Sequence, residues 1–466
     1  MTVLVLSALA SSLLWGGAGM VRAADSTVGL LAGGGGAGMS AVDAPPADAP
    51  VGGVEASSPV PDGAALPTPP LEYPVPAAVS PPAAPNEAAP PASRPPPASP
   101  ATGGVGAPLL SSLQVHGFVS QAFIKSTKNN YLTESRRGSF EFTEVGINLT
   151  HLLTDRLRTG VQLFSREVGK VGDYRARIDW FYLDYRIADW LGVRAGRTKM
   201  PFGLYNDVND IDSARVPVLL PQAVYPILNR DILLALTGIE AYGYIRLGIA
   251  GALDYRLYGG TLYSDPPQAP PGTALADFRV PYVVGARLMW ETPLEGLRAG
   301  ASAQTLRFEA DYAIPTGPSM PPLILKSGIP FVLWLGSIEY VGDDLVLAAE
   351  YGRWHAHVEF TGQPTVRVEN ERYYVMAAYR LTSWLMPGAY YSALIPDVDH
   401  REGRERYQHD WAATVRFDIN SFWLVKLEGH FIRGTADLSS GLNGGTPLDM
   451  LARDWALFLA KTTVYF

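Results

Sequence analysis

The sequence predicts an all-β fold: a 16-stranded antiparallel transmembrane β-barrel, preceded by a signal peptide and a disordered Pro/Ala-rich leader. Three observations predict it: amphipathic segments of strand length, connections that alternate between long and short, and an aromatic residue at the carboxyl terminus. A tilted strand needs about 9–11 residues to cross the hydrocarbon of a bilayer, and most of the segments have this length or slightly more. The predicted strands are Leu113–Ile124, Ser139–Leu152, Arg156–Glu167, Ala176–Ile187, Leu191–Lys199, Thr237–Leu247, Ala252–Tyr263, Val280–Glu291, Leu297–Phe308, Phe331–Tyr340, Leu345–His355, Glu371–Leu381, Trp384–Ile395, Gln408–Ile419, Phe422–Arg433 and Asp454–Phe466.

The connections between these segments are the stronger evidence for a membrane barrel. Connections of about 8 to 37 residues alternate without exception with connections of about 2 to 5 residues. Outer-membrane barrels have short periplasmic turns and long outside loops, whereas a soluble sandwich has no reason to segregate its loops in this way. An even number of strands also places both termini on the side of the short turns.

Each segment has one apolar and one polar face, as a strand between lipid and water requires. In Arg156–Glu167, Leu157 and Leu163 share a face, and Arg158 and Arg166 share the other. Tryptophans near strand ends are expected to form interfacial girdles. These are Trp190, Trp290, Trp384, Trp411, Trp423 and Trp455.

The segment before the barrel has a different composition. Residues 1–24 contain the apolar stretch Val3–Leu14 and small residues near Ala23, which predicts a signal peptide. Residues 25–107 are rich in Pro, Ala and Gly and contain almost no large apolar side chains. Such a segment cannot bury enough surface to fold, so it is expected to be a disordered periplasmic tether. The barrel then occupies residues 108–466.

The longest connection, residues 200–236, is the most informative part of the barrel. Its apolar run Val216–Leu228 would be costly to hold in water, so this third loop is expected to fold into the barrel and to narrow the channel. A surface cap or an oligomer contact is the alternative. The charged residues of the loop are candidates for the constriction: Asp207, Asp210, Asp212, Arg215, Arg230 and Asp231.

The polar phase of the strands is expected to line an aqueous lumen, because a barrel of this size is too wide for side chains to fill. Its predicted basic residues are Arg158, Arg166, Arg177, Arg194, Arg256, Arg287, Arg298, Arg372, Arg380 and Arg416. Its predicted acidic residues are Glu144, Glu240, Asp254, Glu339, Glu350, Asp418 and Glu428. The arginine excess favours anions, but basic and acidic residues are nearly balanced over the whole barrel, which leaves the preference open.

The stretch Arg194–Tyr205, with the sequence RAGRTKMPFGLY, resembles a signature of the phosphate-selective porin O/P superfamily. The resemblance extends over Leu113–Phe466 and implies a sixteen-stranded, trimeric diffusion channel with its third loop as the constriction. By that motif, Arg197 and Lys199 are candidate residues of the pore mouth. The phosphate-binding lysines and arginines of the family have no residue-by-residue counterpart here. The final Phe466 resembles the signal that the barrel assembly machinery of bacteria recognises.

The expected function is that of a porin in the bacterial outer membrane, in contact with lipid, which passes small hydrophilic solutes, with anions such as phosphate as candidates. One alternative is an adhesin or cell-wall anchor that works through the Pro-rich tether. An enzyme is disfavoured because no nucleophile or metal-hydrolase motif is present. His355 and His357 share a strand phase, but a structural role suits them better than a metal site. No metal, cofactor or nucleic-acid partner is expected.

Overall fold

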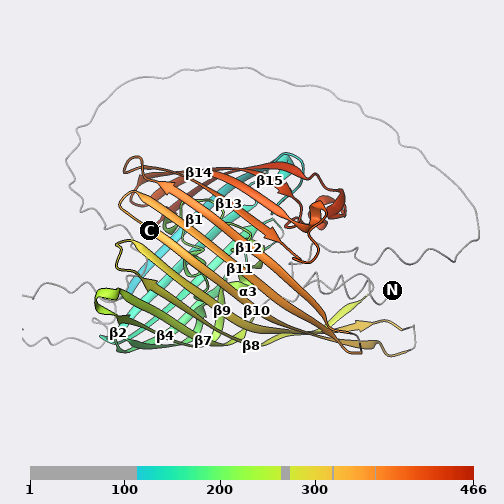
Figure 1. The fold of residues 1–466 in the computed structure, drawn as a ribbon, viewed down its shortest axis with the longest axis horizontal. Helices are drawn as coiled ribbons and strands as arrows, with labels where there is room; N and C mark the ends of the chain where they lie inside the picture. Colours follow the sequence, from blue (N-terminus) through green and yellow to red (C-terminus); the bar gives the residue numbers. More distant parts are fainter. Residues whose placement is uncertain (1–112, 170, 264–272, 317–319, 363) are drawn as a thin grey trace, which may run out of the picture. The chain divides into compact units, whose positions relative to one another are not determined.

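The computed structural model describes residues 113–466, except for 170, 264–272, 317–319 and 363. The predicted signal peptide and tether therefore lie outside the described residues. The described chain forms sixteen strands that close into one barrel, with each strand antiparallel to its neighbours and β1 paired with β16 (Figure 1). Among the described residues, no helix has the length and hydropathy of a membrane-spanning helix.

The strands are β1 (Leu113–Ser126), β2 (Phe142–Thr154), β3 (Leu157–Val168), β4 (Arg177–Ala188), β5 (Leu191–Lys199), β6 (Ala235–Arg246), β7 (Ala252–Leu262), β8 (Ala274–Glu291), β9 (Leu297–Ile314), β10 (Leu323–Val341), β11 (Leu345–Phe360), β12 (Val366–Tyr379), β13 (Leu385–Ile395), β14 (Gln408–Asn420), β15 (Trp423–Gly434) and β16 (Asp454–Tyr465). The helical turns are η1 (Ser135–Arg137), η2 (Asn206–Val208), η3 (Asp212–Ala214), η4 (Ile227–Asn229), α3 (Arg230–Leu233), η5 (Gly248–Ala250), η6 (Arg404–Arg406), η7 (Gly441–Asn443) and η8 (Leu448–Met450).

The prediction of sixteen strands is confirmed, but β8 to β12 are longer at the end of the long loops than expected. In this extension the apolar side chains face the inside of the barrel and the polar side chains face outward, opposite to the pattern in the rest of the wall. Tyr312 and Ile329 are fully buried on the inner face, and Arg279 pairs with Glu309 on the outer face at 2.8 Å. The predicted strands were recognised by apolar residues on the outward face. This pattern ends where the polarity reverses, so the predicted strands end there too. The connection 361–365 is consequently as short as several turns at the opposite end.

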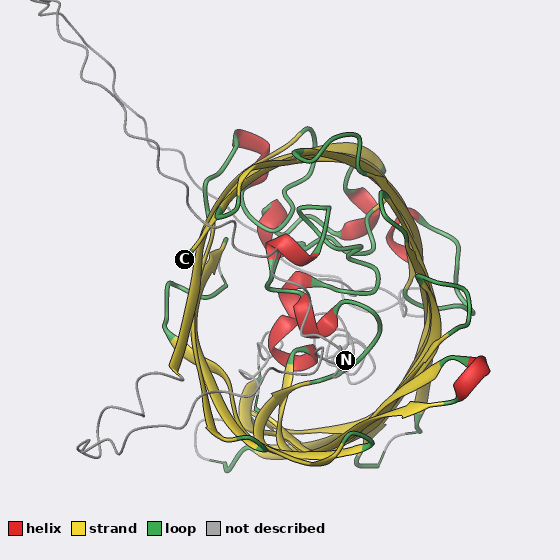
Figure 2. Ribbon diagram, turned by 90° about the vertical axis from the view of Figure 1, so that its left-hand side faces the viewer, coloured by secondary structure: helices red, strands yellow, loops and turns green. Residues whose placement is uncertain are grey.

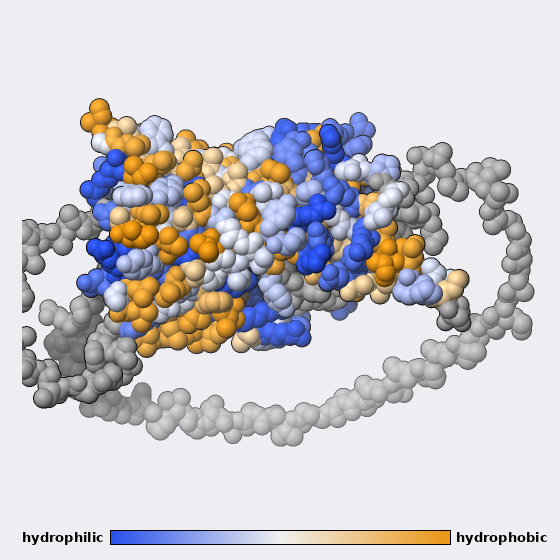
Figure 3. All heavy atoms as spheres, turned by 90° about the horizontal axis from the view of Figure 1, so that it is seen from below, coloured by the Kyte–Doolittle hydropathy of each residue, from blue (hydrophilic) through white to orange (hydrophobic). Residues whose placement is uncertain are grey.

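The outer surface follows the predicted alternation in the membrane-spanning part. Apolar side chains such as Leu163, Ile338 and Phe458 are exposed on the outward phase, and Glu144 and Lys461 are buried on the inward phase. On the face drawn in Figure 3, hydrophobic residues gather toward one end of the barrel and hydrophilic residues toward the other. The long strands thus carry a polar surface beyond the apolar band.

One predicted girdle residue is placed wrongly by the sequence argument. Five of the six tryptophans are exposed, but Trp455 is 2% exposed and donates a hydrogen bond from its indole N–H to the carbonyl of Gly434 at 3.1 Å. Trp455 lies an odd number of residues before Phe466, so it belongs to the opposite face of β16. It packs against Tyr131 of the first loop.

Candidate functional site: the lumen and its inner loop

Residues 200–234, between β5 and β6, lie inside the barrel and are called here the inner loop. Figure 2 shows helical turns and loops within the ring of strands. The apolar run of this loop is buried against the wall: Val216 packs on Ala378 and Met386, and Val218 and Leu219 belong to a cluster with residues of β1 and β16. Full burial of one such side chain contributes about 1.5–3 kcal/mol, which explains why this run does not stay in water.

The first part of the inner loop is anchored on two carboxylates of the wall. Glu350 of β11 accepts hydrogen bonds from the backbone N–H of Leu204 at 3.0 Å, from Tyr374 at 2.8 Å and from the hydroxyl of Tyr225. Tyr205 donates its hydroxyl proton to Glu339 of β10 at 2.8 Å. Burial raises the pKa of Tyr205 and Tyr225 well above the usual value, so both remain donors.

The middle of the loop is anchored on two fully buried lysines of β15 and β16. The Lys461 ammonium lies 2.6 Å from Glu144 and 2.8 Å from Asp212 of the loop. The Lys426 ammonium donates to the backbone oxygens of Asp212 and Arg215, each at 2.8 Å. Burial alone would raise the pKa of Asp212, but Lys461, Arg215 and Lys426 hold this pKa well below its usual value. Asp212 is therefore an anion that these cations fix in place.

A third anchor lies beside these lysines on β15. Glu428 accepts the backbone N–H groups of Val218 at 2.6 Å and Leu219 at 2.9 Å. His430 stands between Glu428 and Asp410, with one ring nitrogen 3.0 Å from each carboxylate. An imidazole that donates from both nitrogens is in its cationic form. His430 therefore places one positive charge between these two carboxylates.

The end of the loop returns to β3 and β4. Arg230 donates two hydrogen bonds to the carboxylate of Asp179, at 2.9 and 2.7 Å. Asp210 contacts Lys199 and accepts a hydrogen bond from Gln162 at 2.8 Å. Burial opposes ionisation of Asp210, but Lys199 and Arg230 lower its pKa to about 2.

Most of the predicted constriction residues are thus partners of the wall. Asp210, Asp212, Arg215 and Arg230 are only 2–7% exposed. Asp207 is more accessible and pairs with Arg287 at 3.2 Å. Of the other predicted residues, Arg197 donates to the backbone oxygen of Asp179, Lys199 contacts Asp210 and donates to the backbone oxygen of Asp207, and Asp231 lies in α3.

Four predicted lumen arginines donate to backbone oxygens of the loop: Arg166 to Ile227, Arg287 to Gly203, Arg372 to Ala223 and Arg416 to Ser213. Sequence reasoning missed Lys426 and Lys461, which contact the loop directly, and His430, which contacts the loop-binding Glu428. The signal was available, because Lys426 and His430 share the phase of Glu428. The alternation of polar and apolar residues could not show that these side chains contact the loop, either directly or through Glu428.

The more accessible arginines of the lumen lining are paired with buried acids of the wall. Arg158 pairs with Asp184 at 2.8 Å, and Arg298 pairs with Glu339 at 2.5 Å. In both pairs 42% of the arginine side chain is exposed, against 4% of the acid. Between them along the wall, Arg194 bridges Asp184 and Glu240, and Arg256 pairs with Glu240 at 3.0 Å. Guanidinium groups therefore cover Asp184, Glu240 and Glu339, whereas Asp254 is 26% exposed beside Arg256 at 22%. We call these four arginines the arginine wall: Arg158, Arg194, Arg256 and Arg298.

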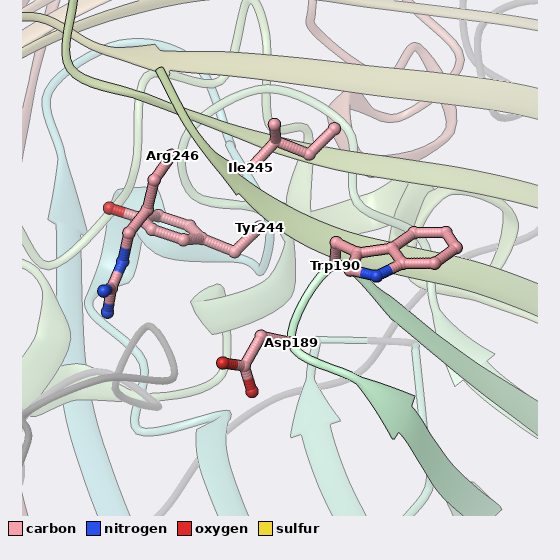
Figure 4. Close-up of a pocket in the computed structure, with 5 residues that line it drawn as sticks. All are labelled: Asp189, Trp190, Tyr244, Ile245 and Arg246. Atoms are coloured by element: carbon pink, nitrogen blue, oxygen red, sulfur yellow. The ribbon is translucent and has the colours of Figure 1, made fainter. Parts of the chain in front are cut away.

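A pocket of about 450 Å³ lies away from the inner loop, at the barrel end that carries the short turns (Figure 4). Asp189 and Trp190 of the turn after β4 line it, with Tyr244, Ile245 and Arg246 at the end of β6. Among the described residues, no group of three His, Cys, Asp or Glu side chains could hold a metal ion.

Comparisons with known proteins identify the fold. No protein-family model matches the chain, and no curated protein is similar to it in sequence. Among solved structures, outer-membrane expressed OmpT of Vibrio cholerae has a TM-score of 0.50 and 11% identity, over 76% of this chain and 97% of that chain. OmpT in its trimer form gives the same score and identity, over 76% and 99%. An anion-selective porin from Comamonas acidovorans has a TM-score of 0.48 and 11% identity, over 76% and 99%. The chain has the sixteen-stranded barrel fold of general bacterial outer-membrane porins.

Proposed function

We propose that the protein is an outer-membrane porin, a passive channel for small hydrophilic solutes. One observation carries this proposal: a closed barrel presents apolar side chains outward and charged side chains inward around a loop that is packed on the inner wall. A barrel of sixteen strands is wide enough for an aqueous channel. The short turns, the start of β1 and the end of β16 then belong to the periplasmic side, and the long loops to the outside.

We further propose that the conducting path runs beside the arginine wall. The inner loop is bonded to strands around most of the barrel: β3, β4, β5, β8, β9, β10, β11, β12, β14, β15 and β16. The arginine wall lies on β3, β5, β7 and β9, in the part of each strand that follows a short turn. Solutes that pass the inner loop would therefore move along guanidinium groups.

The exposure of these groups supports a preference for anions, including phosphate. An arginine that covers its paired carboxylate presents positive charge to the water, even though the pair as a whole is neutral. Rings of charged side chains at a narrow point set the selectivity of a channel. The preference rests on the pairs Arg158–Asp184 and Arg298–Glu339, in which the arginine is the accessible member, and not on the total charge.

The proposal includes assembly as a homotrimer in the outer membrane, with Phe466 as the assembly signal. The similarly folded OmpT of Vibrio cholerae has been solved in a trimer form. Phe466 ends the outward face of β16, and its backbone pairs with Gly117 of β1 at 2.8 and 3.0 Å. The terminal residue thus lies at the seam where the barrel closes.

Planar-bilayer recording of the purified chain tests the function. We expect discrete conductance steps and a reversal potential of anion sign across a salt gradient. A cation-selective potential would refute the anion preference, and the absence of conductance from inserted protein would refute the channel itself. Mass measurement of the detergent-solubilised protein tests the trimer.

A further inference from the structure

The pocket at the short-turn end of the barrel combines aromatic rings with charged side chains that form no ion pair. Trp190 and Tyr244 supply the rings, and Ile245 adds an apolar side chain. Trp190 is 58% exposed. Among the hydrogen bonds between side chains and backbone of the described residues, Trp190 contributes only its backbone oxygen, which accepts the hydroxyl of Tyr255 at 2.6 Å. Its indole N–H is therefore available to a ligand.

Two charged side chains, Asp189 and Arg246, also line the pocket. Both are exposed, and neither forms an ion pair with another described residue. Figure 4 shows Trp190 and Arg246 toward opposite sides of the pocket, with Tyr244 and Asp189 between them. The hydroxyl of Tyr244 donates to Glu291 at 2.6 Å, which orients its ring. The pocket thus offers aromatic surface beside an unpaired carboxylate.

Aromatic rings beside a free N–H donor are the features by which proteins bind proline-rich segments. A run of prolines favours the polyproline II helix, which packs on aromatic side chains and whose carbonyl groups have no partner within the segment. The chain carries such a sequence ahead of the barrel, because residues 41–107 contain 19 of its 39 prolines. The longest proline run is Pro95–Pro97. Arg94, directly before it, is the only lysine or arginine of residues 25–112.

The chain between this proline run and the first strand is long enough to reach the pocket. β1 begins at Leu113, which pairs with His151 close to the turn between β2 and β3, so the chain enters the barrel at the short-turn end. The turn that holds Asp189 and Trp190 lies three to four strands from β1, on the order of 20 Å along the wall. Residues 98–112 can span about 45 Å as polyproline II. An attached segment acts at an effective concentration of about 1 mM, so a weak intrinsic affinity is enough.

We propose that the segment Pro91–Pro100 of the same chain docks in this pocket. Its proline run packs on Trp190, and the indole N–H of Trp190 donates to a carbonyl oxygen of the segment. Arg94 pairs with Asp189, which gives this carboxylate the cation that the barrel does not supply. Docking fixes the chain at the rim of the barrel and leaves residues 25–90 as the working length of the tether. The inference goes beyond the proposed function and does not depend on conduction.

Cysteine cross-linking in the full-length protein tests this inference, because the chain has no cysteine of its own. Ala98→Cys places one thiol next to the proline run, and Leu247→Cys places a second beside Arg246; these two form the pocket pair. The control pair combines Ala98→Cys with Leu153→Cys in the turn between β2 and β3. Leu247 and Leu153 are both 44% exposed, and Leu153 lies closer to β1. An undocked segment would therefore reach Leu153 at least as often as Leu247.

With a short bismaleimide added to the detergent-solubilised protein, we expect the pocket pair to cross-link about tenfold faster than the control pair. Trp190→Ala should lower this ratio by about tenfold, because it removes both the ring and the N–H donor. Asp189→Asn and Arg94→Gln should each lower it by about two- to fivefold, the range of an exposed ion pair. The matched control Asp155→Asn removes an exposed acid of the turn between β2 and β3 and should leave the ratio unchanged.

Equal rates for the two pairs would overturn the inference, and so would a ratio that Asp189→Asn and Arg94→Gln both leave unchanged. These two substitutions are conservative, so they remain informative if Trp190→Ala fails to fold. Products that join two chains would assign the pocket to the segment of a second copy and would also overturn docking within one chain. A protein whose segment docks but which never conducts would contradict the proposed channel and leave this inference standing.

Discussion

Replacement of Lys461 by methionine tests the idea that buried lysines hold the inner loop. The Lys461 ammonium is fully buried and contacts Glu144 at 2.6 Å and Asp212 at 2.8 Å. Methionine keeps the length of the side chain but leaves both acids without this cation. Removal of one partner from a buried ion pair costs about 3–5 kcal/mol. Glu144 is part of the barrel wall, whereas Asp212 can leave with its loop, so the cost should appear as detachment of the loop.

The size of the effect follows from this free energy. A factor of ten in an equilibrium constant corresponds to about 1.4 kcal/mol, so the detached state should become more populated by about two to four orders of magnitude. The chain contains no cysteine, so a single Val218→Cys probe reports on the loop without background. Its thiol is buried in the attached loop, and the rate of its reaction with a maleimide measures detachment.

Lys326→Met serves as the control in the same labelling assay. Lys326 is a largely exposed lysine of β10, 3.9 Å from Asp311, and a pair of this kind contributes about 1 kcal/mol or less. Lys326→Met should therefore leave the labelling rate nearly unchanged. If Lys461→Met labels at the rate of Lys326→Met, the lysine does not hold the loop.

The pH dependence of this variant gives an independent check. In the wild type, Lys461 is the largest of the charges that lower the pKa of Asp212 against the effect of burial. Without Lys461 that pKa rises, and a protonated Asp212 no longer needs a cation. The labelling rate of Lys461→Met relative to Lys326→Met, compared at equal pH, should therefore fall as the solution is made more acidic.

Three further predictions concern selectivity and pH. Arg215→Ala and Arg230→Ala should each shift the reversal potential toward cations and speed the labelling of Val218→Cys. Each substitution leaves a buried carboxylate, of the inner loop or of the wall, without its arginine. Unchanged selectivity in both variants would exclude the loop as the constriction. Arg158→Gln with Arg298→Gln should also shift the potential toward cations, but with unchanged labelling, since neither touches the loop. Burial raises the pKa of Asp437 to about 6, so the folded chain holds this proton more tightly than the unfolded chain, and the resulting stabilisation is lost as the pH rises from about 4 to about 6. Asp437→Asn should abolish that dependence in hydrogen exchange of the loop after β15, and a persistent dependence would assign it to another group.

The strands could be predicted from the sequence because a membrane barrel imposes a period of two on every residue that faces lipid or water. Leu191–Lys199 is the same segment in the prediction and in the structure. The alternation of apolar and polar residues no longer predicts a strand where the outward side chains are polar. In the extensions of β8 to β12 the apolar side chains face inward and the polar side chains outward, so the pattern used for the rest of the barrel did not reveal their full length.

The candidate site was predictable in its residue types but not in its pairings. Arg215 and Arg230 were expected at the constriction because they are charged residues of a long loop. Their burial follows from Asp212 and Asp179, which the chain places beside them through contacts that the sequence order does not reveal. A charge in a confined interior is stable only beside a partner, so the wall and the loop had to be seen together.

The sequence by itself determined the number of strands, the face that most residues of the membrane-spanning part occupy, and the side of the barrel that carries most of the long loops. These properties are local, because they depend on the spacing of residues along one strand and on the length of one connection. Only the tertiary structure decided which charges neutralise one another, that Lys426 and Lys461 hold the inner loop, and that Arg158 and Arg298 are more accessible than their paired acids. Those properties depend on distances between strands that closure of the barrel brings together, and electrostatic energy in a poorly hydrated interior depends steeply on such distances.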